Sequence, residues 1–93
     1  MGLIIMSLFI VTETCTLNAI NDTETSVVGV YTSSTEAMVQ MEKAAEYTAD
    51  TWNQDCSEPR LLLAEDETNE SQIVLEGDEA FYLFQIHEAK VTE

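Results

Sequence analysis

The sequence predicts an α+β fold, in which an antiparallel sheet of four to five strands carries one amphipathic helix packed on one face. Three observations support this expectation. The 93 residues suit one domain, spanning 1–93, with a single small core. Hydrophobic residues make up 45% of the chain, so it should fold despite its charge. One helical pattern also stands between two groups of strand-like segments.

The first group consists of two strands. Leu8 to Val11 is a β-branched and aromatic run that fades into polar residues, and Ser26 to Thr32 is a second such run. Between them, Asn18 to Thr25 has the composition of a loop. Gly29 indicates a bulge or a close backbone approach in the second strand. These segments predict a hairpin with a long connection.

The N-terminal run MGLIIMSLFIV has the hydrophobicity of a signal peptide but lacks its basic start and its cleavage site. Ten apolar residues are also too few to span a bilayer. We therefore expect a buried strand and no membrane segment, with Met6 as an alternative start and export as the minority alternative.

A helix is predicted from about Ser34 to Thr51. Ser33 and Glu36 form a capping box, which satisfies free amides of the first helical turn. Pro59 lies beyond the polar end of the helix. An apolar stripe at spacings of three and four should face the core, a binding groove being the alternative. The stripe residues are Met38, Met41, Ala45, Thr48 and Trp52.

Three further strands are expected after Pro59. Leu61 to Glu65 and Gln72 to Glu76 flank DETNES, which has the composition of a hairpin tip. Gly77 to Ala80 makes the next turn, and Phe81 to Val91 follows. Both faces of this last strand are apolar up to Ile86, which predicts a central strand covered on both sides.

Catalysis is not expected. His87 is the only histidine, no glycine elbow precedes a serine, and three separate glycines cannot cradle a phosphate. The acidic run lacks the glycine and the alternation of a calcium loop, so no cofactor or metal is predicted. Cys15 and Cys56 are expected to be free thiols, and a disulfide is the alternative if the chain is exported.

The charge balance is the most informative feature. Against 18 acidic residues stand Lys43, Arg60 and Lys90, for a formal net charge of −15. This exceeds the magnitude of roughly 2–8 that keeps a small domain soluble. Direct binding to nucleic acid or to an anionic membrane is not expected, because both need clustered basic residues. A basic partner is the natural inference, and a solvated acidic surface, as in halophilic proteins, is the alternative.

The carboxylates are densest between residues 55 and 79. Residues two apart on a strand lie about 6.8 Å apart on one face, close to the spacing of successive phosphates. Glu65 with Glu67, and Glu76 with Asp78, are therefore expected to present phosphate-like pairs of charges. The predicted partner-binding residues are Glu65, Asp66, Glu67, Glu70, Glu76, Asp78 and Glu79.

With its small size and its acidic stretch AEDETNESQIVLEGDEAFYLFQI, the chain resembles small inhibitors encoded by phages and mobile elements. These include anti-CRISPR proteins, anti-restriction proteins and uracil-DNA glycosylase inhibitor, several of which imitate DNA. The resemblance covers mainly residues 58–90 and is one of size, charge and style. The glycosylase inhibitor carries a Gln-Glu-Ser motif on an early strand, whereas Val11-Thr12-Glu13-Thr14 stands here, which argues against that target.

The resemblance implies a non-enzymatic inhibitor in the cytoplasm of a host cell. It would occlude the basic groove of a DNA- or RNA-handling protein such as a CRISPR effector. The alternative is a small interaction or antitoxin-like module that docks through its helix face. The identity of the target and the oligomeric state stay open.

Overall fold

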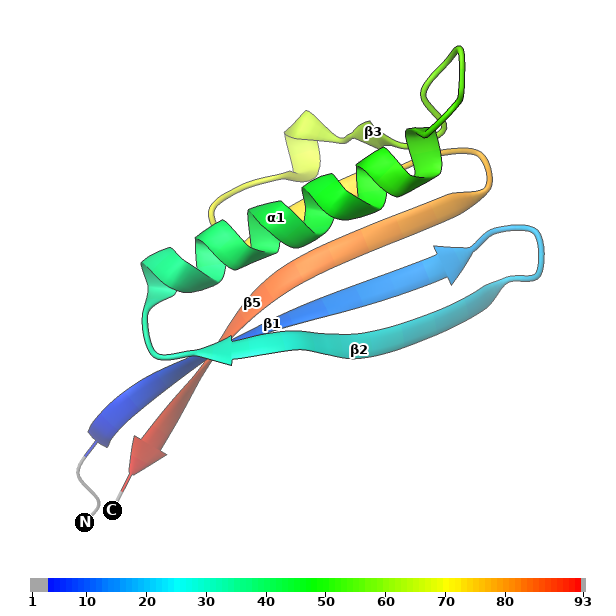
Figure 1. Cartoon of the computed structure of the whole chain (residues 1–93). Helices are drawn as coiled ribbons and strands as arrows, with labels where there is room; N and C mark the ends of the chain where they lie inside the picture. The colour runs from blue at the N-terminus through cyan, green and yellow to red at the C-terminus, as the bar shows by residue number, and fades with distance from the viewer. Residues whose placement is uncertain (1–3, 93) are drawn as a thin grey trace.

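The computed structural model describes residues 4–92 as a five-stranded antiparallel sheet with one long helix lying across it (Figure 1). In chain order the elements are β1 (Ile4–Leu17), β2 (Asp22–Tyr31), α1 (Ser34–Asn53), β3 (Leu62–Leu63), the 3₁₀ helix η1 (Glu65–Glu67), β4 (Gln72–Glu76) and β5 (Ala80–Thr92). The strands lie in the order β2-β1-β5-β4-β3. The predicted α+β class is confirmed. The first three residues of the N-terminal apolar run lie outside the described residues.

The connection between β1 and β2 is shorter than predicted. The turn covers residues 18–21, and β2 begins at Asp22 instead of Ser26. The polar residues that suggested a loop are paired across the hairpin, where hydroxyl groups 3.1 Å apart join Thr14 to Thr25 and Thr16 to Thr23. Their composition marks an exposed edge strand, because all residues of β2 from Asp22 to Val28 are exposed.

Gly29 lies at a β-bulge, as the sequence suggested, and the approach to it is made by a side chain instead of backbone. The register of β1 and β2 shifts beside it, which leaves Val28 as the extra residue of a β-bulge. The Tyr31 ring also lies over Gly29, where an added Cβ would collide with the Tyr31 hydroxyl. A larger residue here would have to displace the Tyr31 ring from this position.

Helix α1 begins where the capping residues predict. The Ser33 hydroxyl accepts a hydrogen bond from the Glu36 amide at 3.3 Å. The helix continues two residues past the expected end and stops at Asn53. Its C-terminal turn is held by a side chain, because Asn53 Oδ1 accepts from the amides of Arg60 and Leu61.

The buried line of α1 differs in part from the predicted stripe. Ala37, Met41 and Ala45 are buried at spacings of four, and the sequence argument missed the first of them. Met38 and Trp52 are only half-buried, because they flank this line and do not point at the centre of the sheet. The helix thus contacts the sheet mainly through small residues around one methionine.

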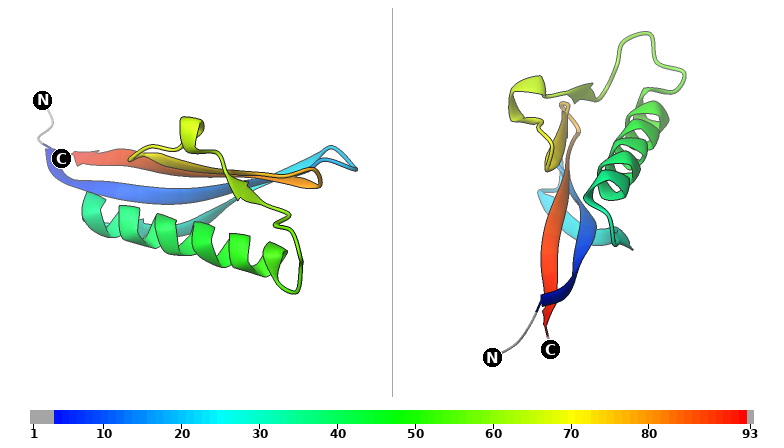
Figure 2. Two further views of the ribbon diagram at one scale, coloured as in Figure 1. Left: turned by 90° about the horizontal axis from the view of Figure 1, so that it is seen from above. Right: turned by 90° about the vertical axis from the view of Figure 1, so that its left-hand side faces the viewer.

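The sheet has one covered face and one open face. The core lies between α1 and the covered face, and its sheet residues are Val11, Ala80, Phe84, Ile73 and Leu75. Figure 2 shows α1 on one side of the sheet and η1 on the other, near β4. On three strands the open face is formed by alternate residues, which are Met6, Leu8, Ile10, Thr12, Thr14 and Thr16 of β1, Thr23, Thr25, Val27 and Val30 of β2, and Phe81, Leu83, Gln85, His87, Ala89 and Val91 of β5. β4 borders it on the same side with Gln72, Val74 and Glu76.

Two strand predictions are corrected by this arrangement. β5 is the central strand of the sheet, as expected. Its second face was expected to be covered, but this face stays open, so Phe81 and Leu83 are only half-buried. The apolar run from Met1 was expected to be a buried strand. In its described part, Val11 is fully buried, whereas Met6 is 42% exposed on the open face.

The segment before β4 is also corrected. The predicted strand Leu61 to Glu65 shrinks to β3, which pairs with β4 through two residues only. The predicted hairpin tip begins with η1, and the tight turn comes later, where the Asn69 amide donates to the Gln72 carbonyl at 2.9 Å. β4 itself matches its predicted bounds, Gln72–Glu76.

Candidate acidic interaction surface

The seven carboxylates predicted to bind a partner are all exposed, but they lie in several places. Glu65, Asp66 and Glu67 form η1, and Glu76 ends β4. Asp78 and Glu79 lie in the turn between β4 and β5, and Glu70 lies in the turn before β4. The chain therefore brings the acidic residues to the outer edge of the sheet without gathering them into a single cluster.

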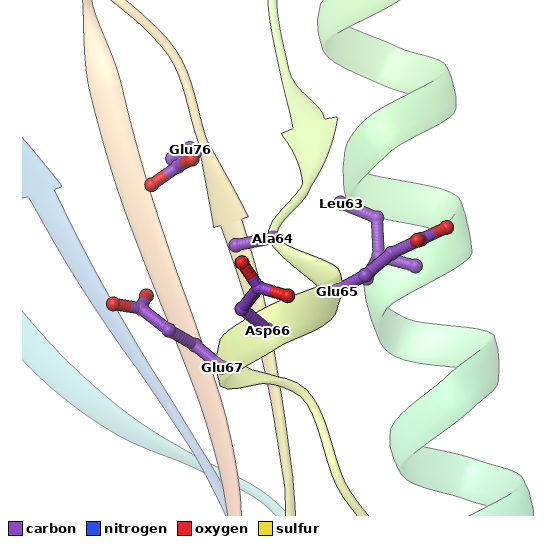
Figure 3. Close-up of a pocket in the computed structure, with 6 residues that line it drawn as sticks. All are labelled: Leu63, Ala64, Glu65, Asp66, Glu67 and Glu76. Carbon is purple, nitrogen blue, oxygen red and sulfur yellow. The ribbon is translucent and has the colours of Figure 1, made fainter.

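Three of these carboxylates point in a common direction. Asp66, Glu67 and Glu76 line a hollow of about 380 Å³ between η1 and the end of β4. Figure 3 shows their carboxylates on the side away from α1, whereas Glu65 points with Leu63 toward the helix. We call the group formed by Asp66, Glu67 and Glu76 the acidic triad.

The expected pairing of Glu65 with Glu67 on a strand face is wrong. Residues two apart share a face only in an extended strand, and this segment is a 3₁₀ helix of three residues per turn. The two side chains consequently diverge, as Figure 3 shows. Glu76 and Asp78 do not form such a pair either, because the strand ends at Glu76 and Asp78 lies in a bend.

Hydrogen bonds fix η1 to the neighbouring strand. The Ala64 amide donates to the Val74 carbonyl at 2.9 Å, and the Val74 amide donates to the Thr68 hydroxyl at 3.1 Å. The Gln72 side-chain amide donates to the Glu67 carbonyl at 2.7 Å. These bonds bracket η1 on both sides, so the acidic triad is held in place before any partner binds.

The turn between β4 and β5 is tied to the turn between β1 and β2. Asn18 Nδ2 donates to the carbonyls of Gly77 and Asp78 at 3.2 and 3.1 Å, and the Asn18 amide donates to the Glu79 carbonyl at 2.9 Å. An added Cβ at Gly77 would strike the Arg60 carbonyl, so a glycine is needed there.

Glu79 has a cation partner within the chain, which was not predicted. Its carboxylate forms an ion pair with Arg60, the only one found among residues 4–92. The Arg60 guanidinium lies over the Trp52 ring, 4.8 Å from its centre, which adds a cation–π contact. The one arginine of the acidic region is therefore used internally.

An apolar groove lies beside the predicted apolar stripe of α1, where a binding groove was the alternative expectation. It encloses about 460 Å³ between α1 and the segment from β3 to β4. Met38, Met41, Leu63 and Ile73 supply its apolar walls, and Glu42 and Glu70 lie at the same groove. The half-buried Met38 was the sequence signal for it, since a methionine beside the core line often borders a groove.

Other carboxylates belong to elements outside the acidic triad. The exposed carboxylates of α1 are Glu36, Glu42, Glu46 and Asp50. The start of β2 adds Asp22 and Glu24. The negative charge thus extends over the helix layer and the turn end of the β1–β2 hairpin. Among the described residues, no group of three or more acidic, cysteine or histidine side chains is arranged to hold a metal ion.

The histidine, the cysteines and one tyrosine of the described part of the chain have the following surroundings. His87 Nε2 lies 3.0 Å from the Thr12 hydroxyl on the open face. Cys15 is half-buried and Cys56 is exposed, and neither forms a disulfide. Burial raises the pKa of Tyr82 above its ordinary value of 10.0, and the adjacent Cys15 side chain raises it further.

Comparison of the chain with protein-family models, curated proteins and solved structures finds no match. The single α-helix within residues 4–92 does not have the length and hydrophobicity needed to cross a membrane. The case for a function therefore depends on the geometry and the charge described above.

Proposed function

We propose that this protein is a non-enzymatic inhibitor that occupies the nucleic-acid-binding groove of a DNA- or RNA-handling protein, such as a CRISPR effector. The observation that carries the proposal is the acidic triad, which is exposed and has no paired cation among the described residues. A formal charge of −15 opposes compaction, so a surface that keeps these charges unpaired calls for a use.

A basic groove is the partner that this surface fits best. Lysine and arginine side chains that normally contact phosphates would find carboxylates on a rigid support, with no basic residue of this protein in the way. Attraction from the whole charge distribution would speed the first encounter by a factor of about 10 to 1,000 at low salt. The same attraction would weaken as the ionic strength rises.

The second candidate is an interaction module that docks through the helix layer. The apolar groove beside Met38 and Leu63 favours it, because Leu63 is 49% exposed and the groove has room for a side chain of a partner. Binding of this kind would depend little on salt, since it would bury apolar surface.

The experiment compares two variants with the same change in net charge. The first variant removes the acidic triad and carries Asp66→Asn, Glu67→Gln and Glu76→Gln. The control variant removes three exposed carboxylates of α1 and carries Glu36→Gln, Glu46→Gln and Asp50→Asn. Immobilised wild-type protein is used to capture proteins from a bacterial lysate. The retained proteins are then purified and tested for binding to a labelled duplex of about 20 base pairs.

The proposal predicts that a retained protein binds the duplex and loses it when this protein is added. Removing the acidic triad should slow association with the retained protein at least tenfold, and the α1 control should slow it much less. Simultaneous binding of the duplex and this protein would contradict the proposal. Equal effects of the two variants would show that net charge alone matters, and salt-independent binding would favour the helix-layer candidate.

A further inference from the structure

Glu76 of β4 lies at the border of the open face, beside its cross-strand partner Phe81. On β1, β2 and β5 the open face carries no carboxylate, lysine or arginine, although charged residues make up 23% of the chain. Its strands instead present apolar and threonine side chains to the solvent. Val27 is 63% exposed, Val30 53% and Met6 42%. An exposed sheet face in so acidic a protein would be expected to carry some of its charge, so the absence is a feature of this face.

The threonines of the open face already have partners within it. Thr14 bonds to Thr25, Thr16 bonds to Thr23, and the Thr12 hydroxyl lies 3.0 Å from His87 Nε2. Covering these side chains would leave them hydrogen-bonded, so the covering surface does not have to supply donors or acceptors. This favours a flat, uncharged occupant over a nucleic acid or a charged protein surface.

We propose that the occupant is a second copy of this chain, packed sheet against sheet through the open face. Each copy offers the other an uncharged surface of the same shape, and both helices lie on the outside. Two sheets pack this way about 10 Å apart, with their strands crossing at about 30°. No carboxylate of β1, β2 or β5 lies on either open face to oppose another.

The position of η1 indicates which two-fold arrangement fits. η1 stands on the open side of the sheet at its β4 border (Figure 2). A two-fold axis along the strand direction places η1 of each copy beside the β2 edge of the other. An axis across the strands would bring both η1 segments together, where Asp66 and Glu67 of the two copies would repel each other.

The size of the face suits a weak dimer. Strands lie about 4.8 Å apart and rise about 3.4 Å per residue, so ten residues on three strands cover on the order of 500 Å² in projection. Two copies would bury about 1,000 Å² in total, which is at the lower end for a specific interface. A reversible association is therefore expected.

Salt should strengthen this dimer, which is opposite to its effect on binding to a basic groove. Two copies of charge −15 repel each other at long range. The screening length falls from about 30 Å at 0.01 M salt to about 8 Å at 0.15 M. Because the interface itself is uncharged, screening removes the repulsion and leaves the apolar contact intact. This test needs no target protein, so it is independent of the proposed function.

The experiment is sedimentation equilibrium of the purified chain at 0.01, 0.15 and 0.5 M NaCl over a range of protein concentrations. At the two higher salt concentrations, we expect the mass to approach twice the 10.4 kDa of one chain as the protein concentration rises. The dissociation constant should be at least tenfold higher at 0.01 M. A single-chain mass under all conditions would overturn the proposal.

Three lysine substitutions locate the interface. Leu83→Lys and Val27→Lys place a charge on the open face, and Val39→Lys makes the same change at a 42% exposed position of α1. Each lowers the net negative charge, so a lost dimer cannot be ascribed to greater repulsion. We expect the two open-face variants to raise the dissociation constant at least tenfold and Val39→Lys to leave it unchanged or lower it.

Circular dichroism checks that each variant folds. If Leu83→Lys unfolds, Val27→Lys decides the question, because the exposed Val27 side chain adds nothing to the core. A dimer that survives in a folded Leu83→Lys variant would point to pairing of β2 edges and overturn the proposal. Loss of the dimer in Val39→Lys alone would place the interface on α1 and also overturn it.

Discussion

The Trp52 indole nitrogen donates a 2.9 Å hydrogen bond to the Tyr82 hydroxyl, and this bond joins the end of α1 to the central strand β5. The two rings meet edge to face, with centres 6.3 Å apart. Tyr82 in turn stacks on the fully buried Phe84. One polar contact therefore links the helix to the core at the point where the apolar line of α1 has ended.

Tyr82 should make the fold sensitive to alkaline pH. Burial and the neighbouring Cys15 raise the pKa of Tyr82, the Trp52 hydrogen bond lowers it in part, and the charge of Glu13 raises it. Since the folded pKa lies above 10.0, the neutral phenol is favoured in the fold. Its stabilising contribution is complete below the unfolded pKa and is lost as the pH rises through the folded pKa. Urea unfolding between pH 8 and 11.5 measures this loss.

Two phenylalanine variants provide the comparison for that measurement. Tyr82→Phe should flatten the alkaline decline and cost about 0.5–1.5 kcal/mol at pH 8, because Trp52 loses its acceptor. Tyr47→Phe alters a 74% exposed side chain and should leave the decline as in the wild type. An unchanged alkaline decline in Tyr82→Phe would show that other groups cause it.

Met41 should be the most sensitive position of the helix. Its side chain is 2% exposed and is among the largest that are fully buried. Met41→Ala should lower the free energy of unfolding by about 2–5 kcal/mol, since it removes buried contacts and leaves a cavity. Val39→Ala, at a 42% exposed position of the same helix, should change it by less than about 0.5 kcal/mol. A loss of only a few tenths for Met41→Ala would mean that the helix packs differently.

Asn53 should be needed to hold the segment between α1 and β3. Its Oδ1 accepts from the Arg60 and Leu61 amides at 2.6 and 2.9 Å, and its Nδ2 donates to the Leu61 carbonyl at 3.0 Å. Asn53→Ala should cost about 1–3 kcal/mol, because the backbone amide and carbonyl of the buried Leu61 lose their partners. Thermal unfolding checks this against Gln54→Ala, an exposed neighbour. Equal effects of the two changes would rule out this role for Asn53.

The elements with strong local signals were predicted well from the sequence. The capping residue Ser33 and the spacing of Met41 and Ala45 gave the start and the buried side of α1, because a helix is specified by neighbours three and four residues apart. β4 was predicted with its observed bounds, since turn residues flank a compact apolar run.

The parts that depend on distant contacts were not predictable in the same way. The hairpin residues Asp22 to Thr25 look like a loop until their threonines are paired with those of β1. η1 depends on hydrogen bonds to Val74 and Gln72, which come later in the chain. The sequence therefore predicted which carboxylates are exposed, but it could not predict their directions or the pairing of Glu79 with Arg60.

Removing the acidic triad should stabilise the fold while it weakens the proposed inhibition. Asp66, Glu67 and Glu76 line one hollow, and no cation of residues 4–92 pairs with them, so their mutual repulsion opposes folding. The variant Asp66→Asn, Glu67→Gln, Glu76→Gln should melt a few degrees higher than the wild type at 0.01 M salt. The gain should shrink at 0.5 M salt, where the charges of the wild type are screened. Differential scanning calorimetry at both salt concentrations measures it, and a lower melting temperature would show that these carboxylates support the fold and are not held ready for a partner.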